Sequence, residues 1–446
     1  MFNKILIANR GEIALRVIRA CRELEIKTVA VYSKADELSL HTKFADEAIC
    51  IGPNESAKSY LNVPSILAAV ELTNADAIHP GYGFLSESAS FASICMDNNI
   101  KFIGSSSETI NLMGNKSLAK DTMKKVGVPI IPGSDGNVDT YDEAKFLCES
   151  MGYPVIVKAA SGGGGKGMRL VNNDSELSNG FEMAKIEAEA AFSDGNVYIE
   201  KYLKNPRHIE IQILCDSFGN VIPLGERECS LQRRHQKVLE ESPSCIMNDS
   251  LRKKLYDSSI KACEAVNYVG AGTIEYLIDD DFNYYFMEMN TRIQVEHPVT
   301  EMVLGIDLIK NQILCHSQIP LPDGMKNLNL RGHAIECRIN AEDPSKSFMP
   351  SPGLISSFHM PGGNGVRVDT HAYSGYFVPQ FYDSMIAKII VHAPTRKEAI
   401  SRMKGALNEC VVEGVKTTIP FLKEILSNPQ FIKGEIHTSF IDELME

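Results

Sequence analysis

Two carboxylates and one amide lie in a predicted β-hairpin, where they could hold a divalent cation. If Asp281 and Phe282 form the tight turn of this hairpin, Glu275 lies opposite Glu288, and Asn290 adds a third oxygen on the same face. Facing carboxylates repel each other unless a cation lies between them, and oxygen ligands favour Mg²⁺ or Mn²⁺. A solvated acidic face is the alternative interpretation.

A run of glycines joins two further predicted strands and could bind phosphate. The strands cover residues 154–160 and 168–171, and the run 162–167 between them is Gly-Gly-Gly-Gly-Lys-Gly. Glycines allow backbone N–H groups to approach phosphate oxygens, and Lys158 and Lys166 supply positive charge. A Walker A loop is excluded, because it needs Ser or Thr after its lysine and then a helix. An ordinary flexible glycine loop is the alternative.

Polar residues alternate with mostly apolar ones after the first hairpin. An extended chain would place on one face Glu288, Asn290, Arg292, Gln294 and Glu296. This density of functional groups exceeds what a solvated strand requires. His297 and Pro298 are expected to end the extended run, and His297 is interpreted as structural because no second histidine lies at ligand spacing.

Basic residues gather in one part of an acidic chain. They are Arg227, Arg233, Arg234, His235 and Lys237. We interpret them as binding a small anion, because 45 basic against 57 acidic residues give a net charge of −12, which disfavours nucleic acid. Farther on, Arg338 lies on the polar face of a predicted strand, a pattern typical of an ordinary salt-bridged arginine.

Length and composition indicate a multidomain globular protein. At 446 residues the chain is long enough for about three domains. The apolar run at residues 5–8 is too short for a signal peptide, and no apolar stretch reaches membrane-spanning length. Eleven cysteines without a C-x-x-C pair suggest reduced thiols. We therefore expect a cytoplasmic protein with neither membrane nor nucleic acid as partner.

The coarse pattern of elements predicts mixed α/β and α+β domains. Residues 1–113 alternate strands and helices, as in a Rossmann-like parallel sheet. A dinucleotide fingerprint is disfavoured there, because Gly11 is alone where three glycines are needed. Helical pattern resumes at Lys116, and the region from 331 to the C-terminus begins rich in strands.

Taken together, these motifs resemble the ATP-grasp fold and specifically the biotin carboxylase family, over almost the whole chain. Further stretches that match the family are residues 7–14, 79–87, 232–237 and 382–385. The resemblance implies a Rossmann-like domain at 1–113, an ATP-grasp region at 114–330 with a mobile glycine-rich lid at 130–203, and a biotin carboxylase C-terminal domain at 331–446.

The resemblance also implies site residues. ATP contacts would come from Lys116, Lys158, Gly163, Gly164, Gly165, Lys166, Glu200, Lys201, Leu203, His208, His235, Glu275 and Glu288. The metal ligands would be Glu275, Glu288 and Asn290. Bicarbonate would be held by Lys237, Arg292, Gln294, Val295 and Glu296, and biotin by Arg338 with Tyr82 and Gln232. Lys166 replaces the arginine of many relatives, which keeps the charge but loses the bidentate fork.

The implied chemistry assigns catalytic roles to Lys237, Arg292, Glu296 and Arg338. Glu296 would take the proton of bicarbonate as it attacks the γ-phosphate of ATP, giving carboxyphosphate. Carboxyphosphate would yield CO₂ and phosphate, and that phosphate would deprotonate N1′ of biotin. Arg338 would stabilise the resulting enolate charge.

The resemblance implies partners as well. No Met-Lys-Met attachment signal is present, so biotin is expected on a separate carrier protein or biotinylated subunit, with a carboxyltransferase component that acts on acetyl-CoA or pyruvate. The resemblance also implies a homodimer. Two other hypotheses remain: another ATP-grasp carboxylate-amine ligase, and a non-catalytic ATP-binding regulatory module.

Overall fold

The computed structural model describes residues 1–159, 168–192 and 195–446. These described residues divide into two compact units, each with its own core. The larger unit comprises residues 1–128, 207–276 and 288–446, and the smaller one comprises residues 129–206 and 277–287. The boundaries expected near residues 113 and 330 both fall within the larger unit and stay a prediction.

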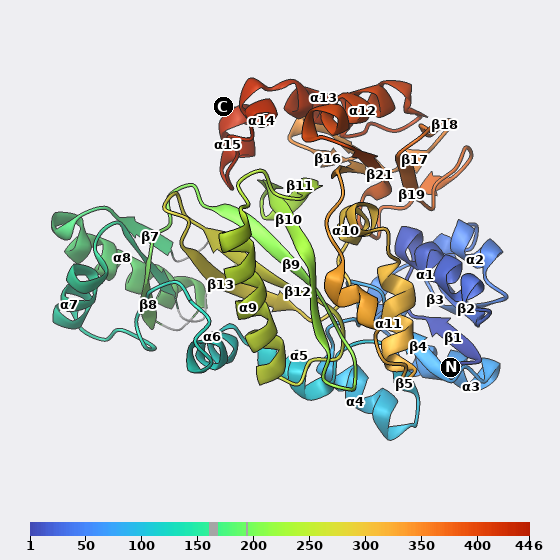
Figure 1. Cartoon of the computed structure of the whole chain (residues 1–446), viewed down its shortest axis with the longest axis horizontal. Helices are drawn as coiled ribbons and strands as arrows, with labels where there is room; N and C mark the ends of the chain where they lie inside the picture. The colour runs from blue at the N-terminus through green and yellow to red at the C-terminus, as the bar shows by residue number, and fades with distance from the viewer. Residues whose placement is uncertain (160–167, 193–194) are drawn as a thin grey trace. The chain divides into compact units, whose positions relative to one another are not determined.

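The N-terminal part of the larger unit is a parallel sheet, as the alternating pattern predicts (Figure 1). Its strands run in the order β3-β2-β1-β4-β5 and are β1 (Lys4–Ile7), β2 (Lys27–Ser33), β3 (Glu47–Gly52), β4 (Ala77–His79) and β5 (Lys101–Phe102). The helices of this part are α1 (Gly11–Glu23), α2 (Leu40–Phe44), α3 (Val63–Thr73), α4 (Ala89–Asp97) and α5 (Ser107–Gly114). Gly11 has a φ of +67°, a conformation that favours glycine. The role of this single glycine is therefore to allow the backbone turn at the start of α1.

The smaller unit contains the strands on both sides of the glycine run. In its sheet β6 (Val155–Ala159) lies between β7 (Met168–Val171) and β8 (Val197–Lys201), and Lys158 pairs with Met168 in antiparallel register. The helices α7 (Tyr141–Met151) and α8 (Asp174–Phe192) supply apolar residues to its core. A strand therefore follows the glycine run, which confirms that it is not a Walker A loop. Residues 160–167 themselves lie outside the described part of the chain.

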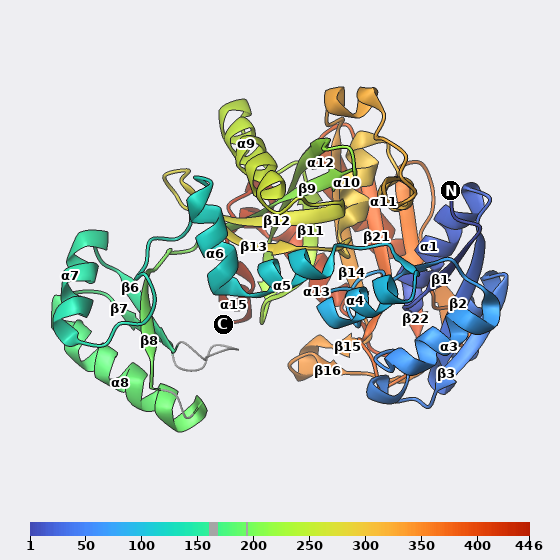
Figure 2. The ribbon, with the colours of Figure 1, turned by 90° about the horizontal axis from the view of Figure 1, so that it is seen from below.

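A large sheet positions most of the candidate site residues. Its strand order is β13-β12-β9-β10-β11-β14-β21-β19, and Figure 2 shows β14 and β21 side by side. Its strands are β9 (Arg207–Cys215), β10 (Val221–Arg233), β11 (Gln236–Ser242), β12 (Gly270–Ile278), β13 (Tyr284–Asn290), β14 (His333–Asn340), β19 (Val366–Thr370) and β21 (Met385–Ala393). Neighbouring strands bring distant residues together: β11 and β14, for example, pair Glu240 with Glu336.

Further helices and short strands complete the described fold. The helices are α6 (Lys116–Lys125), α9 (Asp249–Ala265), α10 (His297–Leu304), α11 (Leu308–His316), α12 (Arg396–Glu409), α13 (Ile419–Ser427), α14 (Pro429–Lys433) and α15 (Phe440–Met445). The short strands are β15 (Glu342–Asp343), β16 (Met349–Pro350), β17 (Gly353–Leu354), β18 (Ser357–His359), β20 (Phe377–Val378) and β22 (Val411–Glu413). Within the described ranges, no helix combines the length and the apolar character needed to cross a bilayer.

The turn of the β12–β13 hairpin differs from the prediction. Asp279 N–H donates to the carbonyl oxygen of Asn283 at 3.0 Å, and Phe282 N–H donates to the carbonyl oxygen of Asp279 at 3.1 Å. Three residues therefore separate Asp279 from Asn283, and Phe282 adopts a left-handed φ of +61°. The prediction of a tight two-residue turn at Asp281 and Phe282 is therefore wrong. The sequence did not indicate the longer turn, because Phe282 adopts a conformation that its residue type disfavours.

The extended run predicted after this hairpin also ends early. Strand β13 stops at Asn290, residues 291–296 are irregular, and α10 begins at His297. The five polar side chains therefore do not share one strand face. His297 is fully buried and its Nδ1 lies 2.8 Å from the carbonyl oxygen of Gln294, consistent with a structural histidine.

Candidate active site

The predicted metal ligands come together at one end of the large sheet. Glu275 on β12 is buried, and its Oε1 accepts a hydrogen bond of 2.7 Å from Nδ2 of Asn290 on β13. Burial and the neighbouring charge of Glu275 raise the pKa of Glu288. Glu275 and Asn290 are buried, Glu288 is partly exposed, and Oδ1 of Asn290 accepts from Arg292. Two carboxylates and one amide form a donor set that would fit Mg²⁺ or Mn²⁺.

Positive groups surround this acidic pair, as the repulsion argument requires. Nζ of Lys237 lies 3.1 Å from Glu275, and Nε2 of His208 lies 2.8 Å from the same carboxylate. Nζ of Lys116 lies 3.8 Å from Glu288. Burial alone would raise the pKa of Glu275, but the charges of Lys237 and His208 outweigh it and hold this pKa well below its ordinary value. Glu275 is therefore ionised, as a metal ligand must be.

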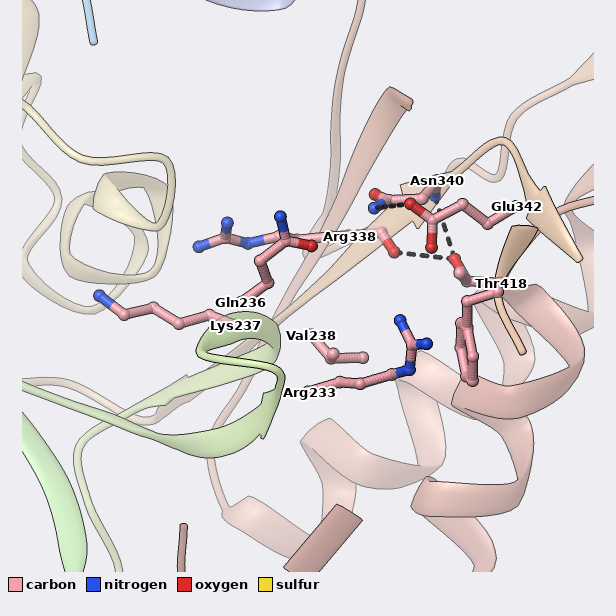
Figure 3. A pocket seen from close by; sticks show the side chains of 9 residues that line it. Arg233, Gln236, Lys237, Val238, Arg338, Asn340, Glu342 and Thr418 are labelled. Carbon is pink, nitrogen blue, oxygen red and sulfur yellow. Dashed lines mark hydrogen bonds between the residues drawn. The ribbon is translucent and has the colours of Figure 1, made fainter. Parts of the chain in front are cut away.

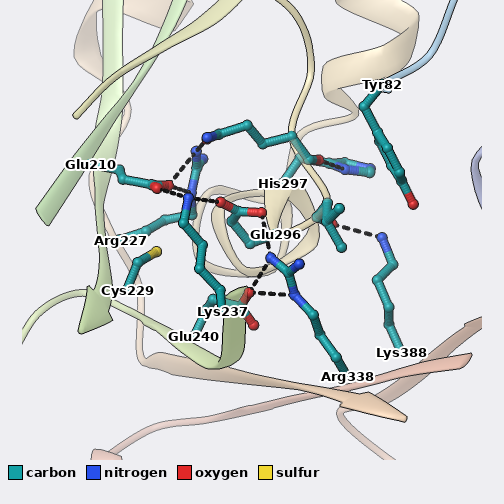
Figure 4. A network of polar contacts seen from close by, with 12 residues as sticks. Tyr82, Glu210, Arg227, Cys229, Lys237, Glu240, Glu296, His297, Arg338 and Lys388 are labelled. Carbon is teal, nitrogen blue, oxygen red and sulfur yellow. Dashed lines mark hydrogen bonds and ion pairs between the residues drawn. The ribbon is translucent and has the colours of Figure 1, made fainter. Parts of the chain in front are cut away.

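Glu296 is held between two cations on the side of the site facing β11 and β14 (Figure 4). Its Oε1 accepts a hydrogen bond of 2.7 Å from Lys237, and its Oε2 accepts one of 2.9 Å from Arg338. The side chain is 2% exposed. Burial would raise the pKa of Glu296, but the charges of Lys237 and Arg338 lower it well below its ordinary value. This carboxylate is therefore ionised, which a general base must be.

Lys237 connects the two parts of the site. Besides Glu275 and Glu296, its ammonium donates to Glu210 on β9. Burial would lower the pKa of Lys237, but Glu210, Glu275 and Glu296 together raise it well above its ordinary value. A permanently charged ammonium surrounded by three carboxylates can bind an anion only by exchanging one partner for another. The arrangement suits a small anionic substrate.

Arg338 lies at the edge of a pocket (Figure 3). Among its lining residues are Arg233, Gln236, Lys237, Arg338, Asn340 and Glu342. Nε of Arg338 donates to Glu240 at 2.7 Å, so this arginine is salt-bridged, as its strand pattern suggests, while its guanidinium also contacts Glu296. A fixed guanidinium at a pocket can stabilise negative charge on a bound group.

The irregular segment after β13 brings further predicted residues to this site. Nε of Arg292 donates to Glu87 at 2.8 Å, and its Nη2 donates to Oδ1 of Asn290 at 3.0 Å. Nε2 of Gln294 donates to Glu275 at 2.8 Å. The carbonyl oxygen of Val295 accepts a 2.7 Å hydrogen bond from Lys388, which fixes the backbone of this segment.

Tyr82 and Gln232 are tied to neighbours rather than to Arg338. The hydroxyl of Tyr82 donates to Glu12, and a hydrogen bond joins Nε2 of Gln232 to Nδ1 of His208. Burial raises the pKa of Tyr82 well above its ordinary value. Gln232 on β10 is the cross-strand partner of Lys237 on β11, and this pairing places Gln232 beside the site.

The predicted nucleotide contacts are distributed over both units. Lys116, His208 and His235 belong to the larger unit, and His235 lies exposed in the turn between β10 and β11 with a φ of +64°. In the smaller unit, Nζ of Lys158 lies 2.5 Å from Glu200. Lys201 in that unit donates to the carbonyl oxygens of Gly152 and Tyr153, and Leu203 is half-buried. Gly163, Gly164, Gly165 and Lys166 lie outside the described residues.

The basic cluster predicted from sequence is not one patch. Arg227 is fully buried in β10, whereas Arg234 is exposed in the hairpin turn. The guanidinium of Arg233 lies 4.0 Å from the ring centroid of Phe348, and its Nη2 donates to the carbonyl oxygen of Ser347. The single-cluster hypothesis is wrong because local sequence shows charge but not burial.

Sequence reasoning did not single out four buried ionisable residues near the site. They are Glu210, Glu240, Glu336 and Lys388. A signal for Glu210 was available: His208, Glu210 and Gln212 alternate with three isoleucines along β9, which predicts one polar strand face. Comparable alternation along β14 contains Glu336.

Comparison with known proteins agrees with this geometry. The biotin carboxylase N-terminal domain model matches residues 1–110, the carbamoyl-phosphate synthase L chain ATP-binding domain model matches 115–323, and the biotin carboxylase C-terminal domain model matches 336–443. Biotin carboxylase of Nostoc sp. is 57% identical over 99% of both chains. A pyruvate carboxylase subunit of Methanothermobacter thermautotrophicus is 54% identical over 99% of this chain and 90% of its own length.

A solved structure supports the same assignment. The biotin carboxylase domain dimer of Hydrogenobacter thermophilus 2-oxoglutarate carboxylase, in complex with MgADP, ADP and bicarbonate, superposes with a TM-score of 0.89. It is 47% identical and covers 99% of this chain and 98% of its own. The fold and the site therefore define an ATP-grasp enzyme, a ligase. Within that class, the chain belongs to the biotin carboxylase family.

Proposed function

We propose that this chain carboxylates biotin on a separate carrier protein, using ATP and bicarbonate and releasing ADP and phosphate. The observation that carries the proposal is the position of Glu296, an ionised carboxylate held between Lys237 and Arg338. A base that contacts one cation suited to bicarbonate and another suited to biotin brings the groups for the two successive steps of the reaction side by side.

The residues of the chain have separate roles in the proposed reaction. Lys237, Arg292, Gln294 and the Val295 backbone bind bicarbonate, and Glu296 removes its proton as it attacks the γ-phosphate. This step forms the bond between a bicarbonate oxygen and phosphorus and breaks the bond to ADP, giving carboxyphosphate. Carboxyphosphate releases CO₂ and phosphate, and phosphate takes the N1′ proton of biotin. Arg338, with Tyr82 and Gln232 nearby, stabilises the enolate that attacks CO₂.

Glu275, Glu288 and Asn290 are the proposed ligands of Mg²⁺ or Mn²⁺. The bound ion would bridge the nucleotide phosphates and neutralise their charge. Within the described residues, the proposed ATP contacts stay Lys116, Lys158, Glu200, Lys201, Leu203, His208 and His235. The glycine run, with Lys166, is proposed as the phosphate flap of a lid at residues 130–203.

The partners belong to the proposal as well. We expect a carboxyltransferase component, a second copy of this chain, and a biotin carboxyl carrier protein or biotinylated subunit. The curated relatives include both biotin carboxylases and a pyruvate carboxylase component, so acetyl-CoA and pyruvate are both candidate acceptors. All eleven cysteines, which lie in described residues, are free thiols, and this fits the cytoplasm as the proposed compartment.

Phosphate release from ATP tests the proposal. With purified protein and Mg²⁺, release should require bicarbonate and should rise when free biotin is added. Release that requires an amine and a larger carboxylate instead would support another ATP-grasp ligase. ATP binding without bicarbonate-dependent turnover would support a regulatory module and would contradict the proposed activity.

A further inference from the structure

Arg227 is a fully buried arginine in the middle of the large sheet, beside the proposed bicarbonate residues (Figure 4). Each of its three nitrogens donates hydrogen bonds. Nε donates to Glu210 at 3.2 Å, Nη1 to Gln212 at 2.6 Å and Thr300 at 3.2 Å, and Nη2 to Thr273 at 2.9 Å and Gln294 at 2.6 Å. A buried guanidinium with this many partners is fixed in position.

The contact with Gln294 fixes which way its side-chain amide faces. A guanidinium has donors and no acceptor, so the end of the amide that faces Arg227 must be the carbonyl oxygen. On the other side, Nε2 of Gln294 donates to the carboxylate of Glu275, which is 2.8 Å away and can only accept. Two neighbours of opposite hydrogen-bonding character therefore select one of the two amide orientations.

The selected orientation points a donor toward the anion site. Nε2 of Gln294 and Nζ of Lys237 both contact Oε1 of Glu275, so they lie around the same carboxylate oxygen. A bicarbonate that replaces this carboxylate contact meets N–H donors from both residues. The opposite amide orientation would present a carbonyl oxygen and would repel an anion.

We infer that Arg227 is a positioning residue for the anionic substrate, which acts by holding the Gln294 amide with its N–H groups toward bicarbonate. The inference rests on the proposed function and extends it to a residue that does not itself touch the substrate. Loss of one hydrogen bond to a charged partner weakens binding about 10- to 100-fold, so this is the size of effect expected on the KM for bicarbonate.

A double-mutant cycle between the two residues tests the inference. Arg227→Lys keeps the charge next to Glu210 but loses the fork that reaches Gln294. We expect this variant, Gln294→Ala and the double variant all to raise the KM for bicarbonate about tenfold or more, with the KM for ATP within about twofold of wild type. The double variant should be no worse than Gln294→Ala. Single effects that multiply in the double variant would overturn the inference.

Thr300→Val is the matched control, since Thr300 accepts from the same guanidinium but makes no hydrogen bond to Gln294 within the described part of the chain. It should leave the KM for bicarbonate near wild type, and an increase equal to that of Arg227→Lys would count against the role of Gln294. If Arg227→Lys does not fold, neutron diffraction of the wild-type complex with bicarbonate decides. Deuterons on the Gln294 atom facing bicarbonate support the inference, and deuterons on the atom facing Arg227 overturn it.

Different results would contradict the proposed function and the role of Arg227. Wild-type protein without bicarbonate-dependent ATP cleavage would contradict the proposed function itself. Wild-type protein with that activity, together with multiplying effects in the cycle, would contradict only the role of Arg227.

Discussion

The carboxylate of Glu296 lies 2.9 Å from the guanidinium of Arg338. Glu296 comes directly before α10, and Arg338 lies on β14. Their ion pair therefore connects two different elements of the fold. The residues are proposed for successive steps, proton removal from bicarbonate and stabilisation of the biotin enolate. Because an ion pair links them, the two steps must be measured separately to assign each role.

The first prediction concerns Glu296→Gln. This change keeps the size and polarity of the side chain but removes its ability to accept a proton. We expect ATP binding to be retained and bicarbonate-dependent ATP cleavage to fall at least about 100-fold. Equilibrium binding of ATP and steady-state phosphate release measure the two properties.

Glu336→Gln is the matched control for that change. Burial raises the pKa of Glu336 well above its ordinary value, and the charge of Glu240 adds to this while Lys388 opposes it, so the neutral amide resembles the form that burial favours. Replacement by the neutral amide should leave ATP cleavage near wild type. Near-normal turnover of Glu296→Gln, or an equal loss in both variants, would contradict the base assignment.

The second prediction concerns Arg338→Gln. The change removes the charge proposed to stabilise the biotin enolate, and leaves Lys237 to hold Glu296. We expect the rate of biotin carboxylation to fall at least about tenfold more than that of bicarbonate-dependent ATP cleavage measured without biotin. Trapping of labelled carboxybiotin and phosphate release report the two rates, and equal losses in both would argue against the enolate role.

The third prediction concerns the metal ligands. Glu275→Gln and Glu288→Gln each remove one ionised oxygen ligand, so we expect the Kd for Mn²⁺ in the presence of a nonhydrolysable ATP analogue to rise about 10- to 100-fold. Electron paramagnetic resonance of free Mn²⁺ measures this Kd without turnover. Asp281→Asn, at an exposed position of the hairpin turn, is the control and should bind Mn²⁺ as wild type does. Unchanged binding by both glutamate variants would contradict the assigned ligand set.

The fourth prediction concerns pH-dependent stability at Glu241. Burial would raise its pKa, but the hydrogen bond from His333 and the charge of Arg396 lower it to about 2. Because the folded pKa is below the unfolded value, Glu241 stabilises the protein above about pH 4.5 and loses this contribution as pH falls toward about 2. We expect Glu241→Gln to lower the free energy of unfolding by on the order of 3 kcal/mol at pH 7.

Urea unfolding at several pH values checks this prediction. The difference between wild type and Glu241→Gln should be constant from pH 7 to pH 5 and should shrink below pH 4.5. Glu409→Gln is the control, because its contact with His359 at 3.4 Å is exposed and exposed pairs contribute little. If the difference in the free energy of unfolding grew as the pH fell, it would contradict a lowered pKa for Glu241.

The sequence predicted those parts of the site that depend on local periodicity. Strand alternation predicted that Glu275 and Asn290 lie together, and the hydrogen bond between them shows that they do, although the turn from which their register was inferred is different. The turn was wrong because the conformation of Phe282 is not evident from its residue type. The resemblance to a family supplied the roles of these residues, and those roles stay predictions until the variants are measured.

The local sequence pattern could not predict contacts between residues that are far apart in the chain. Arg292 leaves the expected strand face and pairs with Glu87, which is 205 residues away. Arg227 was placed with exposed basic neighbours, although its partners lie on other strands and on α10. Burial of a charged residue depends on which strands become neighbours, and that order is set by the whole fold.

Transfer of oxygen from bicarbonate to phosphate tests the central claim most directly. Bicarbonate labelled with ¹⁸O, in unlabelled water, should give phosphate with one ¹⁸O atom per turnover, because the attacking oxygen stays on phosphorus when carboxyphosphate releases CO₂. Mass spectrometry of the released phosphate measures this transfer. Phosphate without ¹⁸O would show that water, and not bicarbonate, attacks ATP, and would contradict the account.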